Sequence, residues 1–446
     1  MIGKIKNILR EKNVSSLMTN MVIAALGLVS FMLLTRQLPK EVFGDWVLFI
    51  TLATFVDLLR FGLTRTSVVR LLSAADEKSF KVLLGSSYRI NLKLLVILAV
   101  VCWGLWFGLA ALEVSVMPGY ELFLKWYPLL AIANLGWNTA SALFQAEQNF
   151  ERMMCVRLAN IGLFVVFLVG NWLWWSLGVD VLLWVYLGVN LLSSCWCTVS
   201  RWDGLWFLRF AEKQTEKELL NFGKFSMGTL IGSSLLRSAD TFIIGLSPVL
   251  GSAGIAIYAI PLKLTDLLGI PLRSFTMTAY PRMSKKFIER DLPGVRKLFY
   301  TYTGAITLLF IPVALGCFFM AEELVLFLGG EEYADQLPLL TLIFRIFTLY
   351  TLLLPLDRFT GVLLDSIDKP KLNLYKVIVM TTANIAVDVL AVFYFESLVG
   401  VAIGTVVFTI IGLFLGLYFL KREIQVKSRQ IVTDSWEFIK NFKLAV

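Results

Sequence analysis

Residues 397–420, SLVGVAIGTVVFTIIGLFLGLYFL, contain no charged residue over a length that crosses the hydrocarbon core of a bilayer as a helix. Residues 158–179, LANIGLFVVFLVGNWLWWSLGV, form a second uncharged stretch of the same kind. Over all 446 residues, 58% are hydrophobic and only 16% are charged, against about 25% charged in an ordinary soluble domain. We therefore expect an all-α polytopic membrane protein, and the composition excludes a soluble protein with a single anchor.

Apolar runs bounded by charged residues or by Gly and Pro predict about 12 membrane-spanning helices. Their expected bounds are 15–36, 43–63, 90–112, 122–144, 155–177, 180–200, 225–246, 252–275, 298–320, 337–359, 374–395 and 398–420. Equal halves suggest an internal duplication with a central cavity between the lobes. We expect a six-helix lobe at 1–200, a cytoplasmic amphipathic linker at 201–224, a second six-helix lobe at 225–420 and a cytoplasmic basic tail at 421–446.

The distribution of charge predicts the orientation. Most of the 41 Lys and Arg residues fall in the two termini and in alternate loops, whereas the loop at 322–335 carries five carboxylates and no basic residue. Because Lys and Arg are retained on the cytoplasmic side, we expect both termini to be cytoplasmic, with residues 1–13 as an interfacial lead-in. The same rule explains the net charge of +9 without a nucleic-acid partner.

The residue types argue against an enzyme. The chain has no histidine and only five cysteines, most of them within apolar runs, and it lacks a GxxxxGK[ST] phosphate loop. Histidine is the usual general base and a common metal ligand. We therefore expect no catalytic residues, no metal site and no cofactor.

Charged side chains cost at least about 2.5 kcal/mol at the centre of a span, so each needs a partner or an aqueous cavity. Three predicted spans carry pairs spaced three residues apart, which places both side chains on one helix face. The pairs are Asp57 with Arg60, Arg237 with Asp240, and Lys263 with Asp266. One interpretation is an internal ion pair in each helix, and the alternative is a shared water-filled cavity.

Such a cavity would contain more cationic side chains than a neutral or cationic ligand needs. The candidate substrate-binding cations are Arg60, Arg237, Lys263, Arg273 and Arg345. These groups suit phosphate or carboxylate, so we expect an anionic substrate. The carboxylates Asp57, Asp240, Asp266 and Asp388 either balance those cations or bind a coupling proton or sodium ion. Asp357 and Arg358 are expected near the cytoplasmic membrane interface.

Several short motifs follow one another along the chain. They are residues 34–45 (LTRQLPKEVFGD), 57–63 (DLLRFGL), 237–245 (RSADTFIIG), 254–259 (GIAIYA) and 280–284 (YPRMS). In order and spacing they resemble the lipid-linked oligosaccharide flippases, of the O-antigen flippase type, in the multidrug, oligosaccharidyl-lipid and polysaccharide exporter superfamily. The second motif departs from the family's pattern by two residues inserted between Leu59 and Gly62.

The resemblance implies a V-shaped transporter in a bacterial inner membrane that alternates between inward-open and outward-open forms. Its substrate would be a polyprenyl-diphosphate oligosaccharide, with the polyprenyl tail left in membrane lipid. By this resemblance Arg36 joins Arg60, Arg237 and Arg273 in holding the diphosphate. We expect a monomer, with possible contact to polysaccharide polymerase machinery.

Three other functions remain open. An ion-coupled drug or metabolite exporter of the same fold would favour an acidic cavity for cationic drugs. An integral membrane glycosyltransferase or polysaccharide polymerase would need a large catalytic loop, and no predicted loop is long enough for one. A structural or assembly subunit could use charged spans to bind partner helices.

Overall fold

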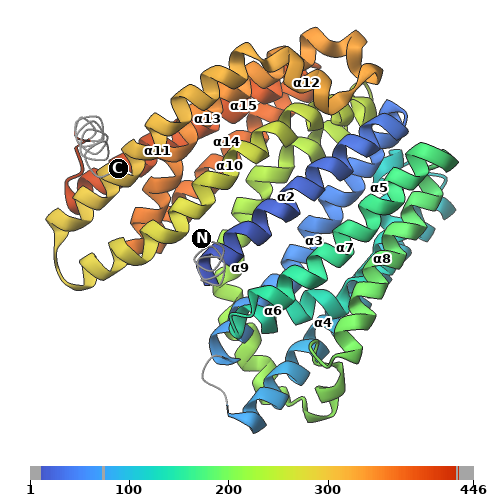
Figure 1. Cartoon of the computed structure of the whole chain (residues 1–446), viewed down its shortest axis with the longest axis horizontal. Helices are drawn as coiled ribbons and strands as arrows, with labels where there is room; N and C mark the ends of the chain where they lie inside the picture. Colours follow the sequence, from blue (N-terminus) through green and yellow to red (C-terminus); the bar gives the residue numbers. More distant parts are fainter. Residues whose placement is uncertain (1–11, 73–75, 428–429, 431–446) are drawn as a thin grey trace, which may run out of the picture. The chain divides into compact units, whose positions relative to one another are not determined.

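The structure is a computed structural model that describes residues 12–72, 76–427 and 430 (Figure 1). Helices contain most of these residues, and none of the described residues lies in a β-strand. In lipid an apolar chain must satisfy its own backbone hydrogen bonds, which an α-helix does within one segment. Packing divides the chain into two compact units, Met1–Ser234 with Gly251–Ile255, and Leu235–Leu250 with Ala256–Val446.

The first unit is a bundle in which α2 packs on α7, α3 on α5, and α6 on α8. Asp76 starts α4 by accepting the Ser79 backbone N–H, and Asn149 starts α7 in the same way from Arg152. The elements are α2 Lys12–Gln37, α3 Lys40–Leu72, α4 Glu77–Ala111, α5 Pro118–Ala133, α6 Leu135–Ala146, α7 Phe150–Gly170, the π-helical turn η1 Asn171–Trp175, α8 Val179–Val199, the 3₁₀ turn η2 Leu205–Phe210 and the first part of α9 Lys213–Gly245.

In the second unit, α11, α13, α14 and α15 run side by side, as the orange and red ribbons of Figure 1 show. Close packing needs glycine in α15, because a Cβ at Gly412 would lie 2.3 Å from Met380 Sδ and one at Gly416 would lie 2.3 Å from Thr360 Oγ1. The elements are the end of α9, α10 Gly251–Ile288, α11 Leu292–Phe319, α12 Ala321–Gly329, η3 Glu331–Gln336, α13 Leu337–Ser366, α14 Pro370–Phe393 and α15 Leu398–Ile424.

The predicted all-α, polytopic architecture is confirmed. Each predicted span coincides with a helix of the structure, except that the span at 122–144 is divided into α5 and α6 at Asn134. Among the described residues, nine helices are long and apolar enough to cross a membrane, and the part Met21–Gln37 of α2 is a shorter apolar stretch. Residues 1–11 of the predicted lead-in and residues 431–446 of the predicted tail lie outside the described residues.

In the structure, the linker expected at 201–224 is divided between two helical elements. It contains the short η2, and then the first turns of α9, which continues to Gly245. Gly204, at φ +96, turns the chain into η2, and Gly85 of α4 lies so close that a Cβ there would be 2.1 Å from the Phe207 carbonyl oxygen. Only glycine permits this approach.

An ion pair also fixes the start of α9 to α4. Glu216 pairs with Arg89 and lies 2.7 Å from Lys93 Nζ. Burial raises the pKa of Glu216, but hydrogen bonds from Lys93 and Arg89 outweigh that effect and hold its pKa below the ordinary value. The linker is therefore part of the first unit, held by backbone packing and by charge.

Candidate functional site

In the first unit, Asp57 and Arg60 form the ion pair that their spacing along α3 predicts. Arg60 Nη2 lies 3.0 Å from Asp57 Oδ1, and the Arg60 side chain is fully buried. Asp57 also accepts hydrogen bonds from the Tyr127 hydroxyl at 3.0 Å and the Asn134 amide at 2.8 Å. Arg60 donates through Nη1 to the Ala131 carbonyl at 3.1 Å. The charge of Arg60 is therefore balanced by Asp57 inside the first unit.

The Ala131 carbonyl is available because a helix ends there. Since α5 stops at Ala133 and α6 begins two residues later, carbonyl groups in the last turn of α5 lack their helical N–H partners. Arg60 supplies a donor to Ala131, and the Ser194 hydroxyl of α8 supplies one to Ala133. Ser194 also accepts the Trp137 backbone N–H at 3.1 Å. Arg60 therefore stabilises the break between α5 and α6.

In the second unit, four cations and one carboxylate gather on a largely exposed surface. This surface, called the cationic face below, consists of Arg237 of α9, Lys263, Asp266 and Arg273 of α10, and Arg358 of α13. Arg237 Nη2 lies 3.6 Å from Asp266 Oδ1, and about half of each side chain is exposed. Lys263 and Arg273 both lie within electrostatic range of Arg237 and Asp266, and Arg273 also interacts with Arg358.

The predicted internal pair of Arg237 with Asp240 is wrong. Residues three apart on a helix differ in direction by about 60°, and here that angle separates an exposed surface from a buried one. Arg237 is exposed and pairs with Asp266, whereas Asp240 is 5% exposed and points into the unit. Sequence reasoning also missed Arg358 as a member of the cationic face, because its position at a span end suggested only the membrane interface.

Asp240 belongs to a buried cluster with a second carboxylate, Asp388. Asn384 of α14 donates through Nδ2 to Asp240 Oδ1 at 2.9 Å and to Asp388 Oδ2 at 3.0 Å. The Tyr258 hydroxyl donates to Asp240 Oδ2 at 2.6 Å, and the Thr405 hydroxyl lies 3.4 Å from the same oxygen. The cluster thus joins α9, α10, α14 and α15, and we call it the carboxylate cluster.

The carboxylate cluster carries two acids without a cationic side chain. Within the described part of the chain neither Asp240 nor Asp388 forms an ion pair, and both are buried. The Oδ1 atoms of Asp388 and Asn384 receive no hydrogen bond from the described residues. Two buried negative charges require a proton or a bound cation. Carboxylate, amide and hydroxyl oxygens are the ligands that hard cations prefer.

A third charged group of the second unit, Asp357 with Lys376, is fully buried. Lys376 Nζ lies 2.6 Å from Asp357 Oδ1, and it donates to the Asp357 carbonyl and the Thr360 hydroxyl, each at 2.9 Å. Asp357 is expected near the cytoplasmic membrane interface, and in the structure its side chain is 9% exposed inside the second unit. Lys376 is not among the site residues expected from the sequence, where it closely follows Lys369 and Lys371.

Of the two remaining predicted cations, one lies at a helix end and the other contacts a helix end. Arg36 is exposed in the last turn of α2. Arg345 of α13 donates through Nε to the Phe318 carbonyl at 3.4 Å, and its guanidinium lies 5.3 Å from the centre of the Phe318 ring. Because Phe318 is in the last turn of α11, Arg345 satisfies a carbonyl that has no helical partner.

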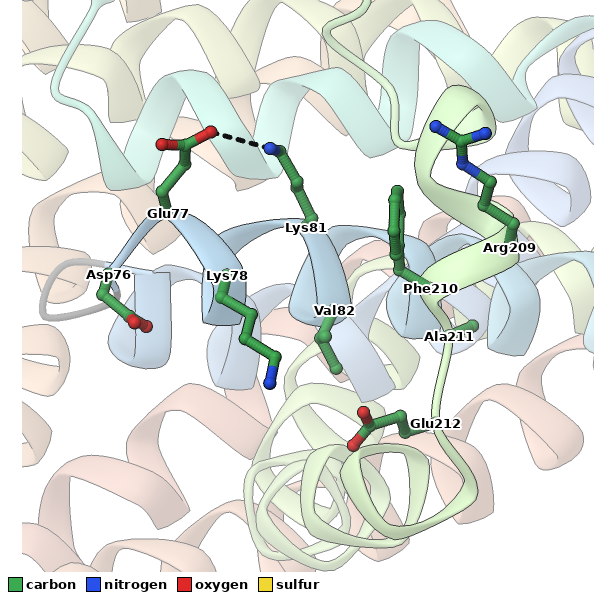
Figure 2. A pocket seen from close by; sticks show the side chains of 9 residues that line it. All are labelled: Asp76, Glu77, Lys78, Lys81, Val82, Arg209, Phe210, Ala211 and Glu212. Carbon is green, nitrogen blue, oxygen red and sulfur yellow. Dashed lines mark hydrogen bonds and ion pairs between the residues drawn. The ribbon is translucent and has the colours of Figure 1, made fainter.

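A hollow of about 830 Å³ lies in the first unit, between α4 and the linker, and Figure 2 shows the side chains that line it. It carries both signs of charge, from Asp76, Glu77, Lys78, Lys81, Arg209 and Glu212. Glu77 and Lys81 pair at 2.7 Å, and hydrogen bonds from Ser79 hold the pKa of Asp76 below its ordinary value, so that it stays ionised. The hollow therefore offers no surplus of one charge, unlike the cationic face.

Solved structures show the same fold. The inward-facing conformation of a multidrug resistance MATE family transporter of the MOP superfamily aligns with a TM-score of 0.73 at 17% identity, over 90% of this chain and 95% of that chain. The lipid II flippase MurJ, in an inward closed conformation, aligns with a TM-score of 0.72 at 14% identity, over 97% and 92%. A MOP superfamily transporter from Pyrococcus furiosus has a TM-score of 0.66 at 17% identity, over 93% and 94%.

No curated protein sequence matches the chain significantly. A family model described as "Polysaccharide biosynthesis protein" matches residues 33–338, which include all of the helices from α3 to α11. The match thus extends through the first unit and across the helices that carry most of the cationic face. With this match over most of its length, the chain belongs to the polysaccharide biosynthesis protein family and has the fold of the MOP superfamily transporters.

Proposed function

We propose that the protein is a flippase that moves a polyprenyl-diphosphate-linked oligosaccharide from the cytoplasmic to the outer leaflet for surface polysaccharide biosynthesis. The observation that carries this proposal is the cationic face, where four cations accompany one carboxylate on helices of a membrane fold. A diphosphate is a fitting ligand, because guanidinium and ammonium groups bind phosphate oxygens through charge-assisted hydrogen bonds. Membership of a polysaccharide biosynthesis family supports the sugar part of the substrate.

The cations divide into two roles in this proposal. Arg237, Lys263 and Arg273 bind the diphosphate, and Asp266 orients Arg237 through their contact at 3.6 Å. Arg36, which is exposed at the end of α2, binds the substrate at another stage of transport. By contrast, Arg60 and Arg345 each donate to a backbone carbonyl at a helix end, so these two residues hold helices in place.

The carboxylate cluster binds the coupling ion, a proton or sodium. An inward movement of this ion supplies energy that the chain cannot take from ATP. Asp240 and Asp388 provide the charge, and Asn384 holds the two carboxylates together through its shared amide. The cluster and the cationic face share two helices: α9 contributes Asp240 to the first and Arg237 to the second, and α10 contributes Tyr258 to the first and Lys263 to the second.

We further propose alternating access in a bacterial inner membrane, with both termini cytoplasmic and the polyprenyl tail in lipid. Transport requires no covalent step and therefore no catalytic residue. A monomer suffices for it, and polysaccharide polymerase machinery would receive the product in the outer leaflet. The rival function is ion-coupled export of a drug or metabolite by the same fold, and the surplus of cations argues against cationic drugs.

The lipid pool of a deletion strain tests the proposal. The strain is complemented with the wild-type gene, with Arg237→Ala or with Lys285→Ala, and polyprenyl-diphosphate oligosaccharide is measured by mass spectrometry. Lys285 is a matched control, because it is a 79% exposed cation outside the cationic face. We expect the complete repeat unit to accumulate severalfold in the deletion and Arg237→Ala strains, with loss of surface polysaccharide. A normal lipid pool in every strain would refute the flippase and make drug or metabolite export the function to test.

A further inference from the structure

A second basic site lies in the second unit, where the start of α11 meets the chain that leaves α15. It is a hollow of about 330 Å³, within the size range of small-ligand pockets. Arg296, Lys297 and Tyr300 of α11 line it together with Gln425 and Lys427. None of these residues belongs to the cationic face or to the carboxylate cluster.

Two hydrogen bonds hold this hollow in shape. After α15 ends at Ile424, Gln425 takes a left-handed conformation, at φ 55, and turns the chain over the first turns of α11. Arg296 Nη1 then donates to the Ile424 carbonyl at 3.1 Å, and the Lys427 backbone N–H donates to the Tyr300 hydroxyl at 2.8 Å. The site is therefore organised before any ligand binds.

The core fixes the direction of the side chains at the turn. Ile424 and Val426 are each 4% exposed and pack in one apolar cluster with Phe299. The residues that alternate with them, Gln425 and Lys427, are exposed. Burial of the apolar residues thus directs the Lys427 side chain to the surface of the hollow.

The charge of the hollow is entirely positive. Its lining includes Arg296, Lys297 and Lys427, and no carboxylate. Within the described ranges none of these three cations forms an ion pair, whereas neighbouring cations do: Lys286 lies 3.0 Å from Asp291, and Lys369 lies 2.8 Å from Glu423. Among the described residues, the nearby acids Asp291 and Glu423 pair with other cations, and the three cations of the lining form no ion pair that would compete with an anion.

The ends of two candidate membrane spans place this hollow at a membrane boundary. Leu292–Phe319 and Leu398–Ile424 are both long and apolar enough to cross, and the hollow lies between the first turns of one and the residues that follow the other. Leu292, next to Pro293 of the lining, is an exposed apolar residue with 38% of its surface accessible, and Ile288 at the end of α10 is 78% exposed. By the distribution of Lys and Arg, this boundary faces the cytoplasm.

We propose that this hollow binds the phosphate of an anionic glycerophospholipid of the cytoplasmic leaflet. Basic pockets at the cytoplasmic ends of membrane helices bind anionic lipid headgroups. Arg296, Lys297 and Lys427 contact the phosphate, and the acyl chains lie against exposed apolar residues at the end of α10 and the start of α11. The bound lipid ties the ends of α11 and α15 together and stabilises the second unit.

Lipid binding by the purified full-length protein tests the proposal. Native mass spectrometry compares phosphatidylglycerol with phosphatidylcholine for the wild type, for Lys297→Gln/Lys427→Gln, and for the control Lys285→Gln/Lys421→Gln. Both double variants lose the same charge, but Lys285 and Lys421 lie outside the lining. We expect Lys297→Gln/Lys427→Gln to bind phosphatidylglycerol with an affinity about tenfold or more below that of the wild type, and the control to bind it as the wild type does.

Three outcomes would overturn the proposal. Equal losses in the two double variants indicate general surface attraction, and equal binding of phosphatidylcholine indicates that the anionic headgroup is not recognised. Full competition by glycerol phosphate at the concentration of the lipid indicates a site for a soluble phosphate. Binding is measured without transport, so these results are independent of the proposed flippase activity.

A cross-linking measurement on the wild type tests the same site without any variant, so its result does not depend on whether the variants fold. A phosphatidylglycerol analogue with a photoreactive headgroup is bound to the protein, and the labelled peptides are identified. We expect labels within residues 292–300 and 421–427. Labels elsewhere, with none in these two segments, would contradict the proposed site.

Discussion

At the scale of the residue, Lys376 and Asp357 show why a buried charge needs its partner. The two side chains are almost fully buried and lie 2.6 Å apart between α14 and α13. Removal of one member of such a pair leaves an uncompensated charge and costs about 3–5 kcal/mol, whereas removal of both costs much less. We expect Lys376→Met to lower the melting temperature strongly, and Lys376→Met/Asp357→Asn to recover most of the loss.

Thermal unfolding of the detergent-solubilised protein measures this effect. The exposed Lys285→Met serves as control, and little change is expected for it because exposed ion pairs contribute about 0–1 kcal/mol. If the double variant unfolds as early as Lys376→Met, the pair does not act as a unit.

At the same scale, Asp388 tests the carboxylate cluster. A ligand that binds only the folded protein stabilises it, by about 2.7 kcal/mol at 100 times its dissociation constant. We expect the wild type to melt later in sodium than in potassium or choline chloride, or later at lower pH if the ion is a proton. Asp388→Asn should abolish the dependence, because it removes one of the two buried charges.

Asp266→Asn is the matched control for Asp388→Asn. It also removes one carboxylate, but from the exposed cationic face, so the ion dependence should persist. A wild-type melting temperature that is the same in all three salts and at every pH between about 5 and 8 would rule out ion binding by the cluster.

At the scale of the element, the division between α5 and α6 could not be read from the sequence. Residues 122–144 are apolar enough for one span, and Asn134 alone is no strong signal for a helix end. What stabilises the break are Arg60 and Ser194, which lie on α3 and α8 and satisfy the carbonyls of Ala131 and Ala133. Arg60 and Ser194 come close to these carbonyls only when the helices pack, so the sequence around Asn134 cannot predict the break.

The contact between α9 and α4 predicts a dependence of stability on pH. Lys93 and Arg89 hold the pKa of Glu216 below its ordinary value, despite the opposing effect of burial. The pair therefore stabilises the fold fully above the ordinary glutamate pKa of about 4.3, and this contribution is lost as the pH falls through the lower pKa of the folded state.

Glu216→Gln should thus destabilise the protein by about 1–2 kcal/mol at neutral pH, with a difference from wild type that shrinks below pH 4 or so. Melting temperatures from pH 7 to pH 3.5 measure this difference. Glu218→Gln, an exposed neighbour on the same helix, should show no such trend. A difference for Glu216→Gln that stays constant over the whole range would show that charge is not what holds the linker.

At the scale of the whole molecule, hydropathy was sufficient to predict the all-α, polytopic architecture. Spans such as 398–420 are recognised by their length and lack of charge, and the structure has a helix at each predicted span. Asp57 and Arg60 were also predictable as a pair, because both lie on one helix. The partners of Asp240 were not, since Asn384 and Thr405 come from helices far along the chain.

One helical turn of α9 separates Arg237, on the cationic face, from Asp240, in the carboxylate cluster. A cation bound beside Asp240 raises the electrostatic potential at Arg237, and therefore strengthens the attraction of that surface for an anion. Thermodynamic linkage makes the effect reciprocal, so that the anion tightens the binding of the cation by the same factor. In the proposed transporter, the affinity for the anion thus depends on whether the cation is bound, and the affinity for the cation depends on the anion in the same way.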